Sequence, residues 1–234
     1  MKVMKSITSI ACASLMAMTM AINVCAAGIT AEPDEIPEPV YVIELREDGY
    51  QYVVNENDPT EKVTGAVYIE SMDDTYYCDN HGRLITNSFV EDEDGNEIYV
   101  DSEGEKVTDK WVEYEGKRYY LDSFGDKMAD EMYELKGKTY YFNEDGSAHK
   151  GLLKYEGNYY YFSKTSCAMV KSVRVQIKNA VYYFGKDGTM QTGWVRIGND
   201  AFYFGNDGKM FTGKKTINGK TYNFAKDGHL ITNK

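Results

Sequence analysis

The residues of this chain best suited to hold a ligand are aromatic. The 234-residue sequence contains 21 Tyr, 9 Phe and 2 Trp, and many of them stand in short runs such as Tyr-Tyr-Phe. The two tryptophans, Trp111 and Trp194, each precede such a run. An aromatic ring attracts organic cations to its face and offers a flat apolar surface. The two tryptophans and the aromatic runs are therefore the candidate ligand contacts of this chain, and packing in a core is the alternative for them.

Catalytic groups do not gather in the same way. His81, His149 and His229 occupy different places around different predicted turns, and the HExxH, GxSxG and CxxC patterns do not occur. A glycosidase needs two carboxyl groups held across one cleft, whereas most carboxylates here stand at predicted turns. We predict no catalytic residue, no cofactor and no enzymatic activity, with a hydrolase kept as an alternative.

One acidic segment, Glu91 to Glu97, has the sequence EDEDGNE and is similar to a calcium-binding loop. An EF-hand loop places acidic residues at alternating positions and lies between helices. The residues on either side of this segment favour strands instead. The segment is therefore interpreted as a solvated acidic turn and no metal site is predicted, with weak calcium binding as the alternative.

The elements that must position the aromatic residues repeat along the chain. Turn glycines recur every 20 to 22 residues, apart from one interval of 42 that spans two periods, at positions 82, 104, 125, 146, 188, 208 and 228. An aromatic run precedes each of these turns, and the run at 158–162 fills the double interval, which makes eight copies. Residues 49–65 form a ninth, degenerate copy with a longer loop.

Each copy is predicted to be a β-hairpin. Aromatic and β-branched residues favour strands, and Asp-Gly is a strong turn signal because glycine adopts positive φ at little cost. A single two-stranded hairpin is barely stable in water, but stacked hairpins cover each other's apolar faces. The predicted fold is all-β: an elongated β-solenoid of stacked hairpin repeats of about 21 residues. Most of the aromatic residues are expected to pack between repeats.

The chain divides into four predicted segments. Residues 1–27 have a basic start, an apolar stretch and small residues near Ala26, which is typical of a secretory signal peptide; an uncleaved membrane anchor is the alternative. Residues 28–40 are an acidic linker with three of the four prolines. Residues 41–75 are predicted to be a degenerate N-terminal capping repeat, and residues 76–234 to be the hairpin repeats.

Charge is distributed unevenly along the chain. Residues 28–110 contain 23 acidic and 5 basic residues, whereas residues 111–234 contain 14 acidic and 19 basic ones. The acidic half argues against nucleic acid as a partner, and favours solubility or attraction to a cationic partner. Cys78 and Cys167 remain after signal cleavage, and we expect two free thiols, because a disulfide-stapled domain has more cysteines.

The repeat pattern resembles the cell-wall-binding repeats of Gram-positive bacteria. The segments that carry the resemblance are VYYFGKDGTMQTGWVRIGND, AFYFGNDGKMFTGKKTINGK and KTYYFNEDGSAHKGLLKYEGN. The family includes choline-binding modules, glucan-binding repeats and the C-terminal repeats of clostridial toxins, and the resemblance extends over residues 76–234. It implies a solenoid of hairpins with ligand grooves between successive repeats. Choline-binding members enclose a quaternary ammonium group with aromatic rings.

The aromatic positions of this family are only partly kept here. The tryptophan after Thr-Gly matches Trp111 and Trp194, but other repeats have Phe89, Met132, Leu152, Val173 and Lys214 there. The slot before Tyr-Tyr, where a choline cage needs tryptophan, holds an aromatic residue only at Tyr159. This departure argues against choline as the ligand. The predicted grooves combine Trp194 with Phe202, and Trp111 with Tyr119 and Tyr133; packing of both tryptophans in the core is the alternative.

These observations predict a secreted, non-catalytic protein that attaches to cell-wall polysaccharide or a teichoic-acid-like polymer through repeated shallow aromatic grooves. The expected location is the cell wall or cell surface. No separate enzymatic domain or wall-sorting motif is apparent, no nucleic-acid partner is expected, and no membrane association is expected after signal cleavage. A surface protein is a second partner class, because solenoids present long interaction surfaces. The alternative function is therefore an adhesin or protein-interaction solenoid, and a spacer remains a further one.

Overall fold

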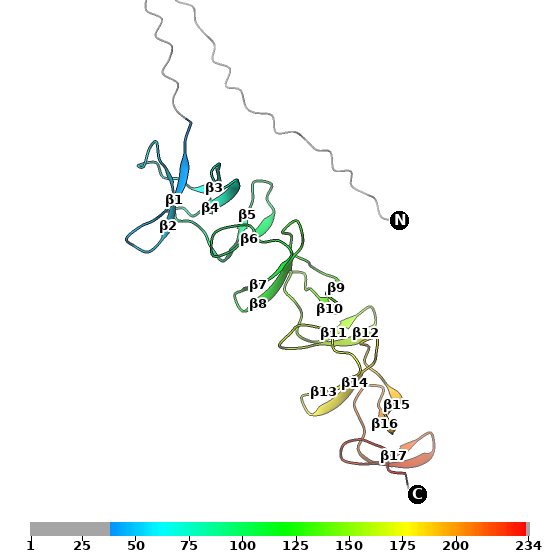
Figure 1. Cartoon of the computed structure of the whole chain (residues 1–234). Coiled ribbons are helices and arrows are strands. Elements are labelled where there is room, and N and C mark those ends of the chain that lie inside the picture. The colour runs from blue at the N-terminus through cyan, green and yellow to red at the C-terminus, as the bar shows by residue number, and fades with distance from the viewer. Residues whose placement is uncertain (1–37, 233–234) are drawn as a thin grey trace, which may run out of the picture. The chain divides into compact units, whose positions relative to one another are not determined.

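A computed structural model of the chain describes residues 38–232. The predicted signal peptide and most of the predicted linker lie outside this range. Within it the structure has eighteen strands and no helix, and every strand pairs with one neighbour in a two-stranded antiparallel sheet (Figure 1). The predicted all-β fold of successive hairpins is confirmed.

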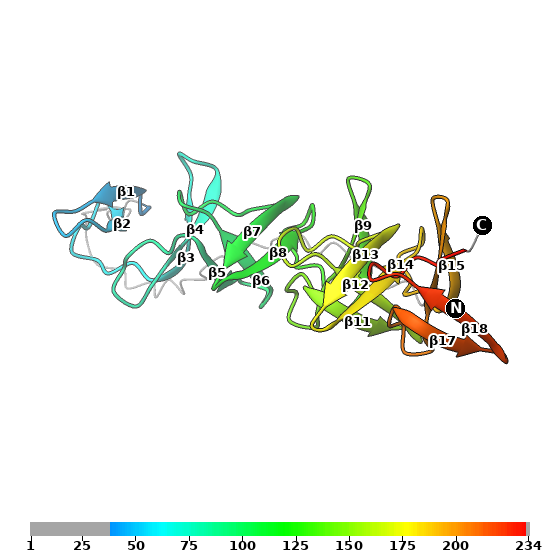
Figure 2. The same ribbon diagram turned by 90° about the horizontal axis from the view of Figure 1, so that it is seen from below.

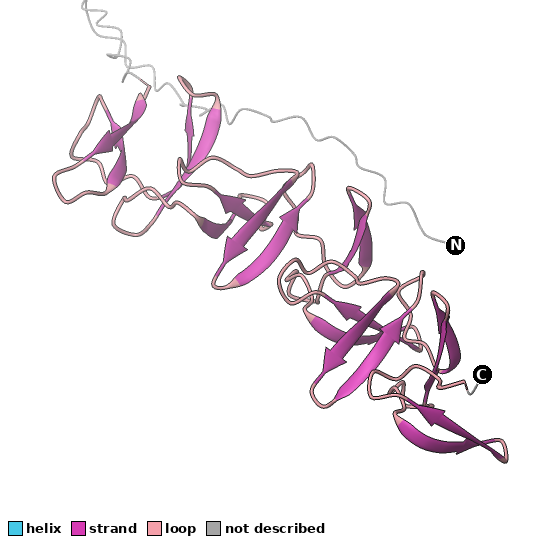
Figure 3. Cartoon of the chain, turned by 60° about the horizontal axis from the view of Figure 1, so that its bottom comes forward, coloured by secondary structure: helices cyan, strands magenta, loops and turns pink. Residues whose placement is uncertain are grey.

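The strands form nine hairpins, which we number in chain order. Each joins two consecutive strands, so that the pairing is local throughout (Figure 3). The strands are β1 Tyr41–Leu45, β2 Gln51–Asn55, β3 Gly65–Ile69, β4 Asp74–Cys78, β5 Ser88–Glu91, β6 Glu97–Val100, β7 Lys110–Tyr114, β8 Lys117–Leu121, β9 Met132–Leu135, β10 Lys138–Tyr141, β11 Gly151–Tyr155, β12 Asn158–Phe162, β13 Val173–Ile177, β14 Ala180–Phe184, β15 Gly193–Ile197, β16 Asp200–Phe204, β17 Gly213–Ile217 and β18 Lys220–Phe224.

Backbone hydrogen bonds join each of several hairpins to the preceding one. After hairpin 7, the N–H of Met190 donates to the carbonyl of Tyr159 in hairpin 6 at 2.8 Å. After hairpin 8, the N–H of Met210 donates to Val181 of hairpin 7, also at 2.8 Å. The turn after hairpin 7 thereby binds to the second strand of hairpin 6, and the turn after hairpin 8 binds to the second strand of hairpin 7. The hairpins follow one another in a solenoid row for this reason (Figure 2).

The core is a series of small clusters between neighbouring hairpins. The last residue of the second strand, or the one after it, is buried in each repeat from hairpin 2 onward; these residues are Cys78, Val100, Leu121, Phe142, Phe162, Phe184, Phe204 and Phe224. Burying a phenylalanine side chain contributes about 1.5–3 kcal/mol. The aromatic runs therefore build the repeat interface, as predicted for most of them.

A turn glycine covers a long side chain of the preceding repeat. Gly208 has a φ of +76°, and a Cβ added there would lie 2.5 Å from the sulfur of Met190. The same arrangement pairs Gly188 with Met169 and Gly228 with Met210. Two constraints therefore favour glycine at position 208: the positive φ of the turn and the close approach of the methionine side chain.

The N-terminal part differs from the prediction in detail. Hairpin 1 is an ordinary two-stranded pair, in which Tyr41 pairs with Asn55. The predicted boundary between residues 75 and 76 falls inside β4, whose partner β3 begins at Gly65. The predicted capping repeat therefore comprises hairpin 1 and most of hairpin 2.

Both cysteines of the described part have free thiols, as the sequence predicts. Cys78 and Cys167 are buried, and burial raises the pKa of the Cys78 thiol to about 11. A thiol with a raised pKa is a weak nucleophile near neutral pH. Cys78 and Cys167 each belong to a buried cluster of the core.

Replacing Gly208 by alanine should destabilise the solenoid more than the same change at Gly198. Both glycines have positive φ, so alanine costs about 1–2 kcal/mol at either position. Only Gly208 faces a neighbour, Met190, whereas nothing lies within 4 Å of a Cβ at Gly198; the overlap adds about 1–3 kcal/mol. Denaturant unfolding of the two variants checks this. Equal losses of stability would show that the methionine contact contributes nothing.

Candidate aromatic binding site

Aromatic rings converge where one hairpin meets the next. We call each such contact a junction and name it by its two hairpins, so that junction 8/9 is the contact between hairpins 8 and 9. The second strand of each hairpin leads to a buried residue, such as Phe204 in hairpin 8. The residue just before it, here Tyr203, pairs with a residue of the first strand. We call that first-strand residue the lead position of the junction. In junction 8/9 it is Trp194, which pairs with Tyr203. The ring centroid of Trp194 lies 5.2 Å from that of Tyr203 and 4.8 Å from that of Tyr222 in the next hairpin.

Junction 8/9 has an exposed aromatic wall. Trp194 is 44% exposed, whereas Phe224 beneath it is buried, with the ring centroids of these two residues 5.7 Å apart. Ala201 lies on the same strand face as Tyr203, two residues earlier, because side chains alternate along a strand. Its methyl side chain is too short to extend over the indole. The arrangement is a shallow surface formed by Trp194, Tyr203 and Tyr222.

Junction 4/5 contains the same set of rings around Trp111. Its centroid lies 5.3 Å from that of Tyr120 and 4.9 Å from that of Tyr140, and it stacks on Phe142. The hydroxyl of Tyr120 donates to the carboxylate of Asp109, and this bond raises the pKa of Tyr120 to about 12. The hydrogen bond fixes the tyrosine ring within the junction.

A cationic side chain covers Trp111. The guanidinium carbon of Arg118 lies 4.6 Å from the centroid of the Trp111 ring, and its Nε is 3.4 Å from a carboxylate oxygen of Glu113. Arg118 occupies in hairpin 4 the position that Ala201 occupies in hairpin 8; we call this the side position. Junction 4/5 therefore differs from junction 8/9 in what stands beside the tryptophan.

The structure corrects the predicted lead residue of hairpin 7. Arg174 pairs with Tyr183, whereas Val173 pairs with Phe184, as Gly193 pairs with Phe204 in hairpin 8. Arg174 therefore takes the place that the sequence comparison gave to Val173. Its guanidinium carbon lies 4.8 Å from the centroid of Phe202.

The rings that surround the two tryptophans differ from the predicted ones. Phe202 pairs with Val195 and packs beneath Arg174 in junction 7/8, so the structure does not bring it to Trp194. Tyr119 packs against Phe89, with centroids 5.1 Å apart, and not against Trp111. The predictions missed the true neighbours, which are Tyr203, Tyr222, Tyr120 and Tyr140.

Of the two other predicted site residues, Tyr133 lies near Trp111, and Tyr159 does not belong to that cluster. Tyr133 packs on Phe142, with ring centroids 5.8 Å apart, and belongs to the same core cluster as Trp111. Tyr159 is exposed, and the ammonium nitrogen of Lys154 lies 5.8 Å from its ring centroid. The roles of all six predicted residues in ligand binding stay predictions.

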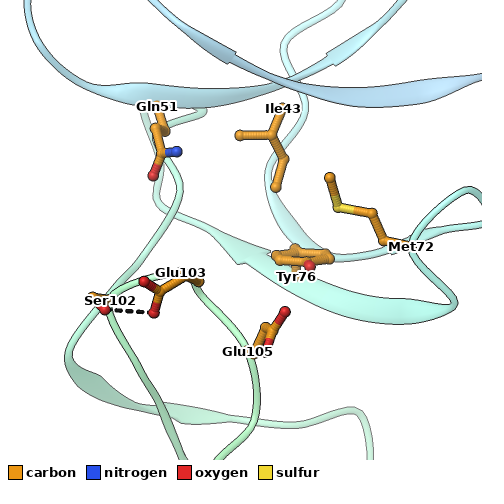
Figure 4. A pocket seen from close by; sticks show the side chains of 7 residues that line it. All are labelled: Ile43, Gln51, Met72, Tyr76, Ser102, Glu103 and Glu105. Carbon is orange, nitrogen blue, oxygen red and sulfur yellow. Dashed lines mark hydrogen bonds between the residues drawn. The ribbon is translucent and has the colours of Figure 1, made fainter.

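A separate pocket of about 620 Å³ lies among hairpin 1, hairpin 2 and the turn after hairpin 3 (Figure 4). Ile43, Met72 and Tyr76 give it an apolar side, and Glu103 and Glu105 give it an acidic one. Burial, together with the charge of Glu105, raises the pKa of Tyr76. Sequence reasoning did not find this pocket, since its residues come from three repeats.

Residues 38–232 also bear on metal binding and on membrane insertion. No group of three or more His, Cys, Asp or Glu side chains in this range is arranged to hold a metal ion. Nor does this range include a helix with the length and apolar character of a membrane span.

Comparison with known proteins matches the repeats to sequence families. Residues 129–173 and 191–234 match the model of the choline-binding repeat, and residues 175–190 match that of a cell wall binding repeat. No curated protein matches the chain.

Solved structures with the same fold come from Streptococcus pneumoniae. Choline binding protein F is 25% identical with a TM-score of 0.62, over 78% of this chain and 70% of that one. CbpJ is 22% identical with a TM-score of 0.60, over the same shares of the two chains. At these identities the likeness concerns chiefly the fold, while the family models identify the repeats themselves. The comparisons thus support the resemblance to cell-wall-binding repeats of the choline-binding type, and the matched repeats lie between residues 129 and 234.

Proposed function

We propose that this protein is a secreted, non-catalytic binding protein that attaches to a cell-wall polymer. The family of its repeats supports an association with the cell wall or cell surface. The observation that carries the proposal is the exposed wall of junction 8/9, where Trp194, Tyr203 and Tyr222 form one aromatic surface. An exposed aromatic surface of this kind suits a sugar ring or an organic cation.

The charges near junction 8/9 favour a polymer that also has anionic groups. Arg196 follows Trp194 by two residues on the same strand and is exposed, and Lys214 and Lys220 are exposed on the strands of hairpin 9. Cations beside an aromatic wall attract phosphate or carboxylate groups. A teichoic-acid-like polymer combines sugar or polyol units with phosphate, so it fits this surface better than a neutral glycan.

The relatives support a wall polymer as the ligand class. One of the similar structures is choline binding protein F in the presence of a peptidoglycan analogue, a tetrasaccharide-pentapeptide. The lead and side positions of junction 8/9 are Trp194 and Ala201. An ammonium group would therefore have the rings of Trp194 and Tyr203 beside it, whereas the ammonium nitrogen of Lys220 already lies 5.4 Å from the centroid of Tyr222. Choline is therefore one group the surface could take, alongside sugar rings.

Replacing Trp194 by alanine should reduce retention on purified cell walls. Truncating a tryptophan anchor commonly costs about 2 kcal/mol, which is roughly a 30-fold loss of affinity. The matched control is Trp111→Ala, because Arg118 covers that indole; it should lower stability and leave retention nearly unchanged. Sedimentation with wall preparations at several protein concentrations measures both variants.

Competition then identifies the recognised group. Release by millimolar choline would assign the surface to a quaternary ammonium ion, and release by wall sugars or polyanions would assign it to the polymer backbone. Unchanged retention of Trp194→Ala, with the variant folded, would contradict the proposal that junction 8/9 is the binding site.

The pocket of Figure 4 favours a second function, attachment to a cationic protein segment. Its apolar side, with Ile43 and Tyr76, and its acidic side, with Glu103 and Glu105, suit a basic and partly apolar peptide. The excess of acidic residues in the N-terminal half of the sequence adds long-range attraction. This supports the adhesin or protein-interaction role as the alternative.

The double variant Glu103→Gln, Glu105→Gln should weaken binding of an oligolysine probe about two- to thirtyfold at low salt, since each of the two exposed ion pairs contributes about 0.2–1 kcal/mol. The control, Glu131→Gln with Glu134→Gln, removes two charges remote from the pocket residues. Calorimetric titration at two salt concentrations measures the effect. If both double variants lose the same affinity, the pocket has no specific role.

A further inference from the structure

The aromatic cluster of junction 3/4 already holds a cation of the chain's own. Phe89 is its lead residue, and its ring centroid lies 5.1 Å from that of Tyr99 and 5.1 Å from that of Tyr119. The ammonium nitrogen of Lys127 lies 4.6 Å from the Phe89 centroid and 5.6 Å from the Tyr119 centroid. An ammonium group within about 6 Å of a ring face is attracted by that face.

A carboxylate completes the surroundings of this ammonium group. The Nζ of Lys127 lies 2.6 Å from Oε2 of Glu97. Glu97 occupies the side position of hairpin 3, the position of Arg118 in hairpin 4 and Ala201 in hairpin 8. The cation therefore has two rings and one carboxylate around it, and these come from hairpins 3 and 4, β5 to β8 in Figure 1.

The fold fixes Lys127 in this place. Lys127 occupies the position of Met190 and Met210 in later repeats, since it forms the bridge with Leu121 that they form with Phe184 and Phe204. A Cβ added at Gly146 would lie 3.1 Å from both Cβ and Cδ of Lys127, so the next turn covers the stem of the lysine. Its side chain is only 20% exposed. Holding the stem leaves little freedom for the ammonium group to move away from the rings.

We propose that Lys127 is an internal ligand of junction 3/4, which closes a cation-binding site that the rings and Glu97 would otherwise offer to an organic ammonium ion. Arg118 over Trp111 closes junction 4/5 in a related way. In junction 8/9 the side position is Ala201, and the ring of Trp194 is exposed. The inference concerns junction 3/4 and does not require that the wall-binding role proposed for junction 8/9 be correct.

The variant Lys127→Met tests the proposal, because methionine stands at the same position beneath a turn glycine in the C-terminal repeats. It removes the cation, keeps the apolar stem and leaves Glu97 free. We expect tetramethylammonium to bind junction 3/4 of this variant at least tenfold more tightly than in the wild type. NMR titration that follows the rings of Phe89, Tyr99 and Tyr119 locates the binding to that junction.

Two further variants make the result specific. Lys106→Met changes the equivalent lysine of the preceding repeat, whose bridge partner is Val100, and should leave junction 3/4 closed. Adding Glu97→Gln to Lys127→Met should reduce the acquired affinity, since the carboxylate would then be lost. Thermal unfolding of each variant establishes that it is folded.

A measurement on the wild type keeps the proposal testable even where a variant fails to fold. Ring currents should shift the ε-methylene protons of Lys127 upfield, and those of Lys106 should stay near ordinary values. Ordinary shifts for Lys127 would overturn the proposal. It would also be overturned if folded Lys127→Met failed to bind tetramethylammonium at junction 3/4, or if the wild type bound it there equally well.

Discussion

The structure depends on the contact between one hairpin and the next, because a two-stranded hairpin cannot bury its own apolar face. Three interactions make this contact in the C-terminal repeats. The N–H of Met210 donates to the backbone of the preceding hairpin, the Met210 side chain lies under Gly228, and Phe204 is fully buried. Each of these interactions is local, so contacts between neighbouring hairpins contribute most of the stability of the solenoid.

The candidate binding surfaces are a by-product of this stacking. In junctions 3/4, 4/5, 7/8 and 8/9 the lead residue lies beside its cross-strand partner and beside an aromatic residue of the next hairpin. Trp194 with Tyr222 makes an aromatic wall, whereas Arg174 in the same place stacks on Phe202. A single substitution at a lead or side position can therefore turn a core contact into a ligand surface without disturbing the backbone.

The sequence predicted the repeat and its hairpins because period, turn glycines and aromatic runs are local signals. It did not predict the neighbours of Trp194, because these depend on strand alternation and on the next repeat. Strand pairing places Tyr203 opposite Trp194 and turns Phe202 to the other face; a count of alternating positions would have found Tyr203. Tyr222 could not be found by this count, since the packing of hairpin 9 on hairpin 8 decides its position.

The error at Val173 has a definite backbone cause. The lead residue Arg174 comes five positions after Met169, whereas Trp194 comes four positions after Met190. The shorter connection uses Gly193 with positive φ, and the longer one uses Ser172 with positive φ. An alignment that places Ser172 of hairpin 7 at the glycine of Thr-Gly therefore puts the strand of hairpin 7 one residue out of register. A shift of one residue exchanges the two faces of a strand.

Arg174 also shows how a residue outside junction 8/9 can shape it. Its Nη1 donates to the carbonyl of Asp227 at 2.9 Å, so hairpin 7 is joined directly to the turn that follows hairpin 9. Arg118 makes the corresponding bond from hairpin 4 to Ser166, after hairpin 6, at 3.3 Å. Such a bond skips one hairpin and restrains the two junctions between its ends. Hairpin 9 supplies Tyr222, so restraining it holds that ring against Trp194 before a ligand arrives, and a preformed surface loses less entropy on binding.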